Sequence, residues 1–294
     1  MRTLVMGWFS FKNYGATAGD IMACELACEW LKTAGHGYDV ALAAPFKGGV
    51  DWRSVDPKRY SHLLFVCGPF GESRDTRKFL ARFVHCRIVG LNLTMLNPLE
   101  RWNPFDFLIE RDSSATAHPD ITFLHDRAKV PVVGLVLVHP QPEYKHRARH
   151  EVANQAIRRL TESREMSVVK IDTRLDENST GLLRTASEVE SLVARMDVVL
   201  TTRVHGMVFA IKNGVPPLVV DPIAGGAKVQ RQAEILGWPA RFNVEHLTDN
   251  ELQRAFDYCL TDEARRKARE CAAIACEEVR ALREQFIAQV ARPI

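Results

Sequence analysis

Short apolar runs alternate with longer amphipathic runs along almost the whole chain. The short runs are rich in Val, Ile and Leu, whereas the longer runs repeat apolar side chains at helical spacing. Strands are predicted at residues 3–6, 38–42, 62–67, 87–91, 105–109, 132–138, 167–171, 198–200 and 217–220. Helices are predicted from about residue 20, over 77–84, over 150–163, from a Ser187/Glu190 capping box, after residue 203, and over 262–290. Such alternation is typical of parallel sheets with crossover helices.

The length of 294 residues favours two lobes. We place the N-terminal α/β lobe at residues 1–128 and the C-terminal α/β lobe, with the long final helix, at 129–294. The predicted fold is α/β, with two Rossmann-like lobes and a cleft between them. This GT-B-like architecture also serves two-lobed glycosyltransferases, and fold alone does not name the reaction. Residues 47–59 are polar and aromatic, and we expect a surface loop there.

Composition excludes several classes of protein. The net charge is only +3, and Lys and Arg are spread among Asp and Glu, so we expect no nucleic-acid partner. No apolar run approaches the length of a membrane span, and the N-terminus lacks the features of a signal peptide. The seven Cys are scattered without zinc-type spacing. We therefore expect a cytoplasmic protein with free thiols, no metal and no integral membrane segment.

The segment 198–228 is the most informative part of the chain. An apolar run ends in Thr201-Thr202, and Arg203 and His205 follow where a helix-like stretch begins. Open α/β sheets bind ligands beyond the carboxyl ends of their strands, and helix N-termini favour anions. With Lys228 after the next strand, the pattern indicates a carboxylate or phosphate ligand and a proton donor. The alternative is a capped helix with an incidental His.

Polar and small residues follow most of the predicted strands. In the first lobe these are Asn13, Gly15, Gly19, Asp20, Gly68, Gly71, Asn92, Thr94, Arg111, Asp112 and Ser113. The second lobe adds His139, Asp172, Thr202, Arg203, His205 and Lys228. If the sheets face each other across a cleft, these residues line it.

The sequence resembles the polysaccharide pyruvyl transferases over most of its length. The residues that carry the resemblance are Asn13, Gly15, Gly19, Asp20, Gly68, Arg111-Asp112-Ser113, Pro119-Asp120-Ile121-Thr122-Phe123, Thr202-Arg203-Val204-His205-Gly206, Gly214-Val215-Pro216, Lys228 and Leu236-Gly237. The Arg-x-His-Gly and Gly-Val-Pro combination is the most specific part. One departure from the family pattern is His139, where we expect Arg or another polar residue.

The resemblance implies transfer of a pyruvyl group from phosphoenolpyruvate to a sugar diol, with a cyclic ketal and phosphate as products. It implies a donor site of Arg111, Arg203, Lys228, His139 and Thr202. Arginine grips carboxylates and phosphates through paired hydrogen bonds. His205 is the expected general acid, and Asp20 or Asp172 is the expected proton acceptor. No cofactor is expected beyond phosphoenolpyruvate as the donor substrate.

The acceptor is expected to be a glycan or glycolipid in polysaccharide biosynthesis, bound on the N-terminal lobe. The expected acceptor-binding residues are Asn13, Tyr14, Gly15, Gly19, Asp20, Gly68 and Asn92. Tyr14 can stack on a sugar face, whereas Asp20 has an alternative role as the cap of the first helix. A homo-oligomer is compatible with the long final helix. Two other functions stay open, a glycosyltransferase that uses a nucleotide sugar and a non-catalytic protein that binds anions or sugars.

Overall fold

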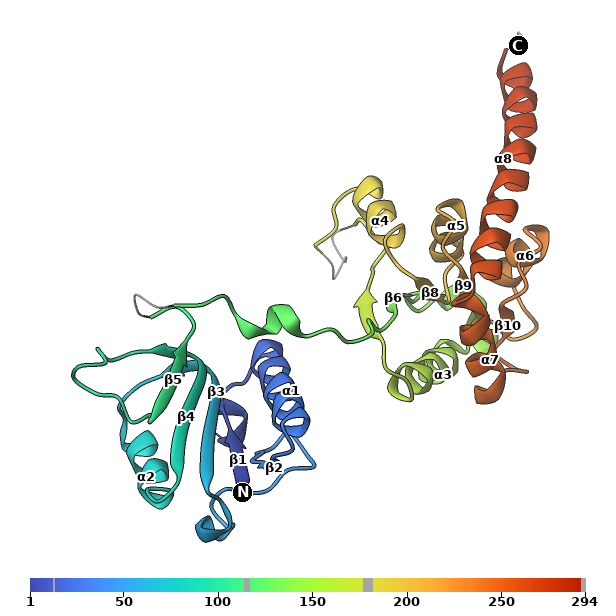
Figure 1. Cartoon of the computed structure of the whole chain (residues 1–294). Coiled ribbons are helices and arrows are strands. Elements are labelled where there is room, and N and C mark those ends of the chain that lie inside the picture. The colour runs from blue at the N-terminus through green and yellow to red at the C-terminus, as the bar shows by residue number, and fades with distance from the viewer. Residues whose placement is uncertain (13, 114–116, 177–181, 292–294) are drawn as a thin grey trace. The chain divides into compact units, whose positions relative to one another are not determined.

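The computed structural model describes residues 1–12, 14–113, 117–176 and 182–291. The chain divides into two compact α/β units, an N-terminal unit at Met1–Ala128 and a C-terminal unit at Lys129–Ile294 (Figure 1). Within these described ranges, each unit contains one five-stranded sheet, and every strand pair in both sheets is parallel. The α/β class with two Rossmann-like parts and a long C-terminal helix is thus confirmed.

The N-terminal unit has a sheet of order β2-β1-β3-β4-β5. Its strands are β1 (Arg2–Met6), β2 (Gly37–Val40), β3 (His62–Phe70), β4 (Arg87–Met95) and β5 (Phe107–Glu110). Its helices are η1 (Trp8–Ser10), α1 (Ala18–Thr33), η2 (Pro57–Arg59), α2 (Arg74–Arg82) and η3 (Ile121–Leu124). Helix α1 packs with Val5 on one face, and Phe79 of α2 packs with Leu4 and Met6 on the other. The pleat explains this division, because successive side chains of a strand point to opposite faces.

Strands β3 and β4 run further than the sequence indicates. Gly68 lies inside β3, and Asn92 lies inside β4 rather than after it. Both strands continue through left-handed residues, namely Cys67 at φ 64°, Gly68 at φ 85° and Asn92 at φ 60°. The register between β4 and β5 also shifts between Leu91 and Leu93. A local irregularity of this kind bends a strand without ending it, so the prediction that the glycine ends β3 was wrong.

The C-terminal unit has a sheet of order β10-β9-β8-β6-β7. Its strands are β6 (Val132–Val136), β7 (Ser167–Lys170), β8 (Val198–Thr201), β9 (Pro217–Asp221) and β10 (Arg241–Asn243). Its helices are η4 (Pro142–Arg147), α3 (His150–Glu162), α4 (Ala186–Val193), α5 (Val204–Lys212), α6 (Lys228–Ile235), α7 (Asp249–Cys259) and α8 (Asp262–Val290). Figure 1 shows α3 and α7 on one side of the sheet, with α4 and α5 on the other. Numbered along its own unit, each sheet has the strand order 2-1-3-4-5.

Two helix starts differ from the sequence prediction. Helix α4 is capped by Thr185, whose hydroxyl accepts a hydrogen bond from the Glu188 N–H, so the Ser187/Glu190 capping box was wrong. Helix α1 is capped by Thr17, and Asp20 is the third helical residue of that capping box. Reciprocal bonds of this kind satisfy backbone N–H groups that the first turn leaves free. At the end of α5, Gly214 has φ 69°, as expected of the residue after a helix.

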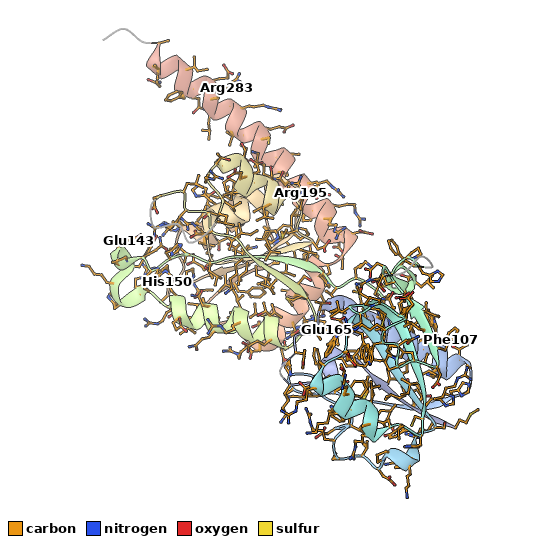
Figure 2. All side chains as sticks on the ribbon, turned by 90° about the vertical axis from the view of Figure 1, so that its left-hand side faces the viewer. Phe107, Glu143, His150, Glu165, Arg195 and Arg283 are labelled. Atoms are coloured by element: carbon orange, nitrogen blue, oxygen red, sulfur yellow. The ribbon has the colours of Figure 1, made fainter. Side chains whose placement is uncertain are left out.

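Within the described part of the chain, helix α8 packs into the core of its unit through its first three turns. Ala264, Ala268 and Cys271 are buried in the core of the C-terminal unit. The remainder extends beyond the other helices of that unit, as Figure 2 shows at Arg283. Among the residues that the structure describes, no helix is both long and apolar enough to cross a membrane. In the N-terminal unit, the expected surface loop at 47–59 buries Trp52 and Val55 in the core, so that expectation was partly wrong.

Candidate functional site

The strand order places two sets of predicted residues at switch points. In an open parallel sheet, ligands bind beyond the carboxyl ends of the strands where the strand order reverses. In the C-terminal unit this point lies between β6 and β8. His139 follows β6, and Thr202 and Arg203 follow β8. The fold therefore gathers these three residues at the edge where a ligand is expected.

Two buried threonines fix the chain on either side of this switch point. Thr201 donates its hydroxyl to the Val136 carbonyl at 2.8 Å and accepts the Arg203 N–H at 2.9 Å. The hydroxyl of Thr202 accepts the Val138 N–H at 2.9 Å. These contacts tie the ends of β6 and β8 together. Thr202, predicted to bind the donor, has its oxygen engaged in this structural contact.

Gly206 explains one part of the Arg-x-His-Gly motif. A Cβ at this position would lie 2.4 Å from Thr201 Oγ1 and 2.8 Å from Val136 Cγ1. Contacts this short force atoms apart, because protein interiors are close-packed. The first turn of α5 can therefore approach β6 and β8 only with glycine at 206.

Arg203 has a buried polar group at this edge that lacks a hydrogen-bond partner among the described residues. It is the N-cap residue of α5 and is partly buried, and its Nη1 is inaccessible to solvent without a hydrogen-bond partner among the described residues. Burial lowers the pKa of Arg203, and Arg174 lowers it further, while Asp172 and Asp176 raise it. A buried donor without an acceptor costs about 1–3 kcal/mol, and more when charged. An anion bound here would remove that cost.

The two histidines of this edge differ in their surroundings. His139 Nε2 lies 3.1 Å from Asp172, which also accepts the Arg174 N–H at 2.9 Å. His205 is exposed in the first turn of α5, and its ring lies 6.0 Å from that of Phe209. A carboxylate partner orients His139, whereas His205 is open to a ligand.

Lys228 lies on the next strand connection, at the first position of α6, and its side chain is exposed. Its neighbour Asp221, a fully buried carboxylate at the end of β9, was not predicted from the sequence. Asp221 accepts the N–H groups of Ile223, Ala227 and Gln230 at 3.0, 2.8 and 2.9 Å. Asp221 thus already occupies part of the anion-favouring end of α6. The position of this acid directly after a β-branched run is the signal that could have revealed it.

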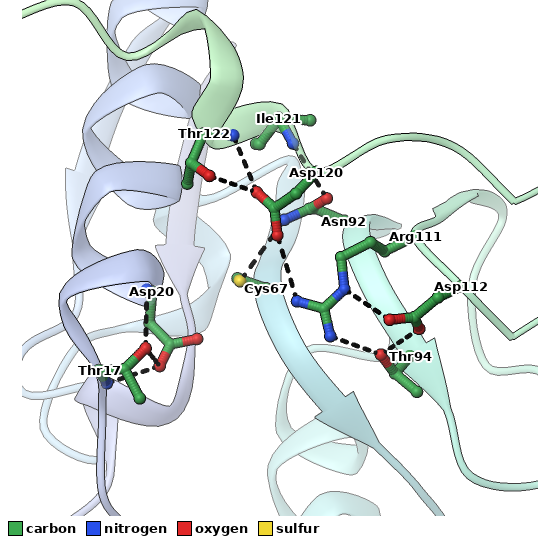
Figure 3. Close-up of polar contacts among 10 residues, drawn as sticks. All are labelled: Thr17, Asp20, Cys67, Asn92, Thr94, Arg111, Asp112, Asp120, Ile121 and Thr122. Carbon is green, nitrogen blue, oxygen red and sulfur yellow. Dashed lines mark hydrogen bonds and ion pairs between the residues drawn. The ribbon is translucent and has the colours of Figure 1, made fainter.

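Arg111 is the centre of a polar cluster in the N-terminal unit (Figure 3). Its guanidinium donates to Asp112 at 2.9 Å, to Asp120 at 3.3 Å and to the Thr94 hydroxyl at 2.8 Å. Although burial raises the pKa of Asp120, hydrogen bonds from Thr122, Asn92 and Arg111 bring it below its ordinary value. The predicted donor-binding Arg111 therefore already has carboxylate partners within its own unit.

A thiol lies beside this cluster at the switch point between β1 and β3. Asn92 donates to Cys67 Sγ at 3.5 Å, and a Cβ on Gly68 would lie 3.6 Å from Asp20 Oδ1. Burial and the neighbouring Asp20 carboxylate raise the pKa of Cys67 to about 11. The structure thus brings Asp20, Gly68 and Asn92 together around Cys67, which the sequence analysis did not single out.

In the loop after β1, which was expected to bind the acceptor, some of the predicted residues are already engaged in contacts within the protein. Asn13 lies outside the described residues. Tyr14 stacks on Trp8 with centroids 4.5 Å apart and donates to Asp75 at 3.2 Å, so one ring face is already covered. Gly15 is exposed, and Gly19 lies in the first turn of α1. Asp20 Oδ2 accepts the Thr17 N–H at 2.7 Å, which is its helix-starting role.

No cluster of three or more His, Cys, Asp or Glu that could hold a metal occurs within the described ranges. The sequence gives no match among curated proteins. Solved structures with partial likeness include the spinosyn forosaminyltransferase SpnP, at 14% identity over 93% of this chain and 94% of that one, with a TM-score of 0.30. They also include the UDP-GlcNAc 2-epimerase of Methanocaldococcus jannaschii, at 9% identity over 94% and 99% of the two chains, with a TM-score of 0.33.

A third solved structure with partial likeness is that of the glycosyltransferase SnogD of Streptomyces nogalater. It has 15% identity over 96% of this chain and 99% of that one, with a TM-score of 0.28. Identities and scores this low do not inform on the reaction. The model of the family described as "Polysaccharide pyruvyl transferase" matches residues 119–222, which supports a transferase. The resemblance to the polysaccharide pyruvyl transferases is therefore confirmed over residues 119–222, the segment that carries His139, Arg203 and His205.

Proposed function

We propose that the chain transfers the pyruvyl group of phosphoenolpyruvate to two hydroxyls of a sugar or polysaccharide, forming a cyclic ketal and releasing phosphate. The observation that carries this proposal is the buried Nη1 of Arg203 at the switch point of the C-terminal unit, which has no hydrogen-bond partner among the described residues. The donor has a carboxylate and a phosphate, and either group supplies the acceptor that this nitrogen lacks. The family match over residues 119–222 contains this arginine.

The proposed mechanism gives each side chain one task. Arg203 binds the anionic donor, and Lys228 adds a second cation at the neighbouring strand end. His205 protonates the methylene carbon, so that C2 becomes cationic and open to attack by an acceptor hydroxyl. A second hydroxyl then displaces the phosphate. The two hydroxyl protons balance the proton gained by carbon and the one carried away by hydrogen phosphate.

His139 and Asp172 are proposed to accept a proton from the attacking hydroxyl, because their hydrogen bond gives the imidazole a fixed orientation. The ketal reaction as written requires neither a metal nor a redox cofactor. Arg111 is not assigned to donor binding in this proposal, since its guanidinium already pairs with Asp112 and Asp120.

Donor binding is tested by calorimetric titration of the purified chain with phosphoenolpyruvate. Arg203→Ala should weaken binding by about 1.5–3 kcal/mol, the scale of a hydrogen bond to a charged group. Arg158→Ala is the matched control, because Arg158 is exposed on α3 and follows no strand end. An unchanged dissociation constant for Arg203→Ala and for Lys228→Ala would contradict the proposed donor site.

The same titration separates the other functions. A glycosyltransferase would bind a nucleotide sugar, such as UDP-glucose, through Arg203 and would not respond to phosphoenolpyruvate. A non-catalytic anion-binding protein would bind phosphoenolpyruvate but release no phosphate with any diol. A panel of sugar acceptors with phosphate detection therefore decides between transfer and binding alone.

A further inference from the structure

A polar pocket lies in the N-terminal unit, and its lining includes no residue of the Arg111 cluster. It has a volume of about 140 Å³, several times the ~30 Å³ of one liquid water. Segments that follow β1, β2 and β3 meet there. The lining residues are Phe11, Lys12, Tyr14, Trp52, Arg53, Asp75 and Lys78. The fold thus combines an aromatic floor with charged groups from three separate parts of the sequence.

Trp52 lines this pocket and carries a buried indole N–H. Its side chain is only 6% exposed, and its Nε1 is buried without a partner among the described residues. The ring is held by Phe11 at 5.5 Å and by Phe79 at 6.2 Å between centroids. Buried indole N–H groups usually have an acceptor. The missing acceptor points to a polar ligand beside Trp52.

The charges around the pocket favour an anion. Lys12, Arg53 and Lys78 line it, against one carboxylate, Asp75. Lys12 and Lys78 have no ion pair with any residue in the described parts of the chain, and Asp75 already accepts the Tyr14 hydroxyl. The guanidinium carbon of Arg53 lies 4.7 Å from the centre of the Trp52 ring. Its Nη1 lies 3.9 Å from Oδ1 of Asp51, which is a long distance for an ion pair.

We propose that this pocket binds the anionic group of an acidic sugar, a carboxylate or a phosphate, and so selects a charged glycan as the acceptor. This inference rests on the proposed transfer to a sugar. Lys12 and Lys78 hold the anion, and the Trp52 N–H completes its hydrogen bonds. Tyr14 is 40% exposed beside them and offers apolar area to the sugar ring. The aromatic lining is why we assign a sugar rather than a free inorganic anion.

The test uses nuclear magnetic resonance of the indole N–H groups in the full chain labelled with nitrogen-15. The chain has five Trp, and Trp52→Phe identifies the Trp52 signal by its loss. The probes are glucuronic acid, glucose 6-phosphate, glucose and inorganic phosphate. Glucuronic acid or glucose 6-phosphate should shift the Trp52 signal in a saturable way, whereas glucose should not. An equal response to glucose, or no response to either charged sugar, overturns the proposal.

Substitution of two exposed lysines tests whether their charges bind the sugar, without disturbing the core. The double variant Lys12→Gln/Lys78→Gln should weaken binding of the charged sugar about tenfold or more, as expected for loss of hydrogen bonds to a charged group. Lys58→Gln, on the exposed η2 turn, is the matched control. Inorganic phosphate that binds as tightly as glucose 6-phosphate would show that the sugar contributes nothing and would refute the assignment.

Binding of phosphoenolpyruvate serves as a separate readout on the same variants. It should be unchanged in Lys12→Gln/Lys78→Gln, since Arg203 and Lys228 belong to the C-terminal unit. Loss of sugar binding with retained donor binding supports the pocket. Absence of donor binding in the unmodified chain instead contradicts the proposed transfer, whatever the sugars do.

Discussion

Replacing Gly206 with alanine tests the packing that holds Arg203. The added Cβ would lie 2.4 Å from Thr201 Oγ1 and 2.8 Å from Val136 Cγ1, both on fully buried residues. The Thr201 hydroxyl cannot move away without loss, because it holds the Val136 carbonyl and the Arg203 N–H. We therefore expect Gly206→Ala to destabilise the C-terminal unit and to displace Arg203.

The magnitude follows from three contributions. Overpacking a close-packed site costs about 1–3 kcal/mol. Disturbing two hydrogen bonds of Thr201 adds about 0.5–1.5 kcal/mol for each bond. Alanine gains roughly 0.5–1 kcal/mol over glycine as a helix residue. The net loss of unfolding free energy is about 1–5 kcal/mol, which corresponds to a fall of roughly 2–20 °C in the melting temperature for a unit of this size.

Scanning calorimetry measures the fall, and hydrogen exchange of a peptide spanning 198–212 shows whether the end of β8 and helix α5 lose protection. Gly15→Ala is the control, because Gly15 is exposed and an added Cβ would meet no atom within 4 Å. Its melting temperature should stay close to that of the unmodified chain. If Gly206→Ala melts like Gly15→Ala and still binds phosphoenolpyruvate, the packing argument is wrong.

Four further variants or treatments give separate checks. His205→Ala should keep the melting temperature, since His205 is exposed, yet lower phosphate release about 10²–10⁴-fold; near-normal release would exclude it as the acid. Arg111→Ala should lower the melting temperature, because Asp112 and Asp120 lose their cationic partner; normal stability with lost donor binding would assign it to the ligand instead. Iodoacetamide at pH 8 should label exposed Cys276 well before Cys67, as read by peptide mass spectrometry, and equal rates would contradict the buried thiol. The pKa of Cys67 in the folded chain is raised to about 11, whereas that of an unfolded thiol is ~8.5. The stability that the protonated Cys67 thiol contributes is therefore fully present below pH ~8.5 and is lost as the pH rises toward about 11. Urea unfolding across that pH range measures this loss.

Local patterns predicted the elements around the C-terminal switch point. The apolar run into Thr201, the helix that ends before Gly214 and the long final helix all depend on neighbours within a few residues. Helix periodicity, strand runs and glycine after a helix act over that range, so the sequence could reveal them. The short β10 and the polar helices α6 and α7 were missed, because their patterns are brief or weakly apolar.

The sequence by itself determined the α/β class, the turn from strand to helix that carries Arg203 and His205, and the part of the family resemblance that lies in residues 119–222. Only the tertiary structure decided which residues share a site. It paired His139 with Asp172, paired Arg111 with two carboxylates, and gathered Trp52 into one pocket with residues that follow β1 and β3. The physical reason is that charge pairing and burial depend on residues far apart in the chain, whereas sequence patterns report only the spacing of near neighbours.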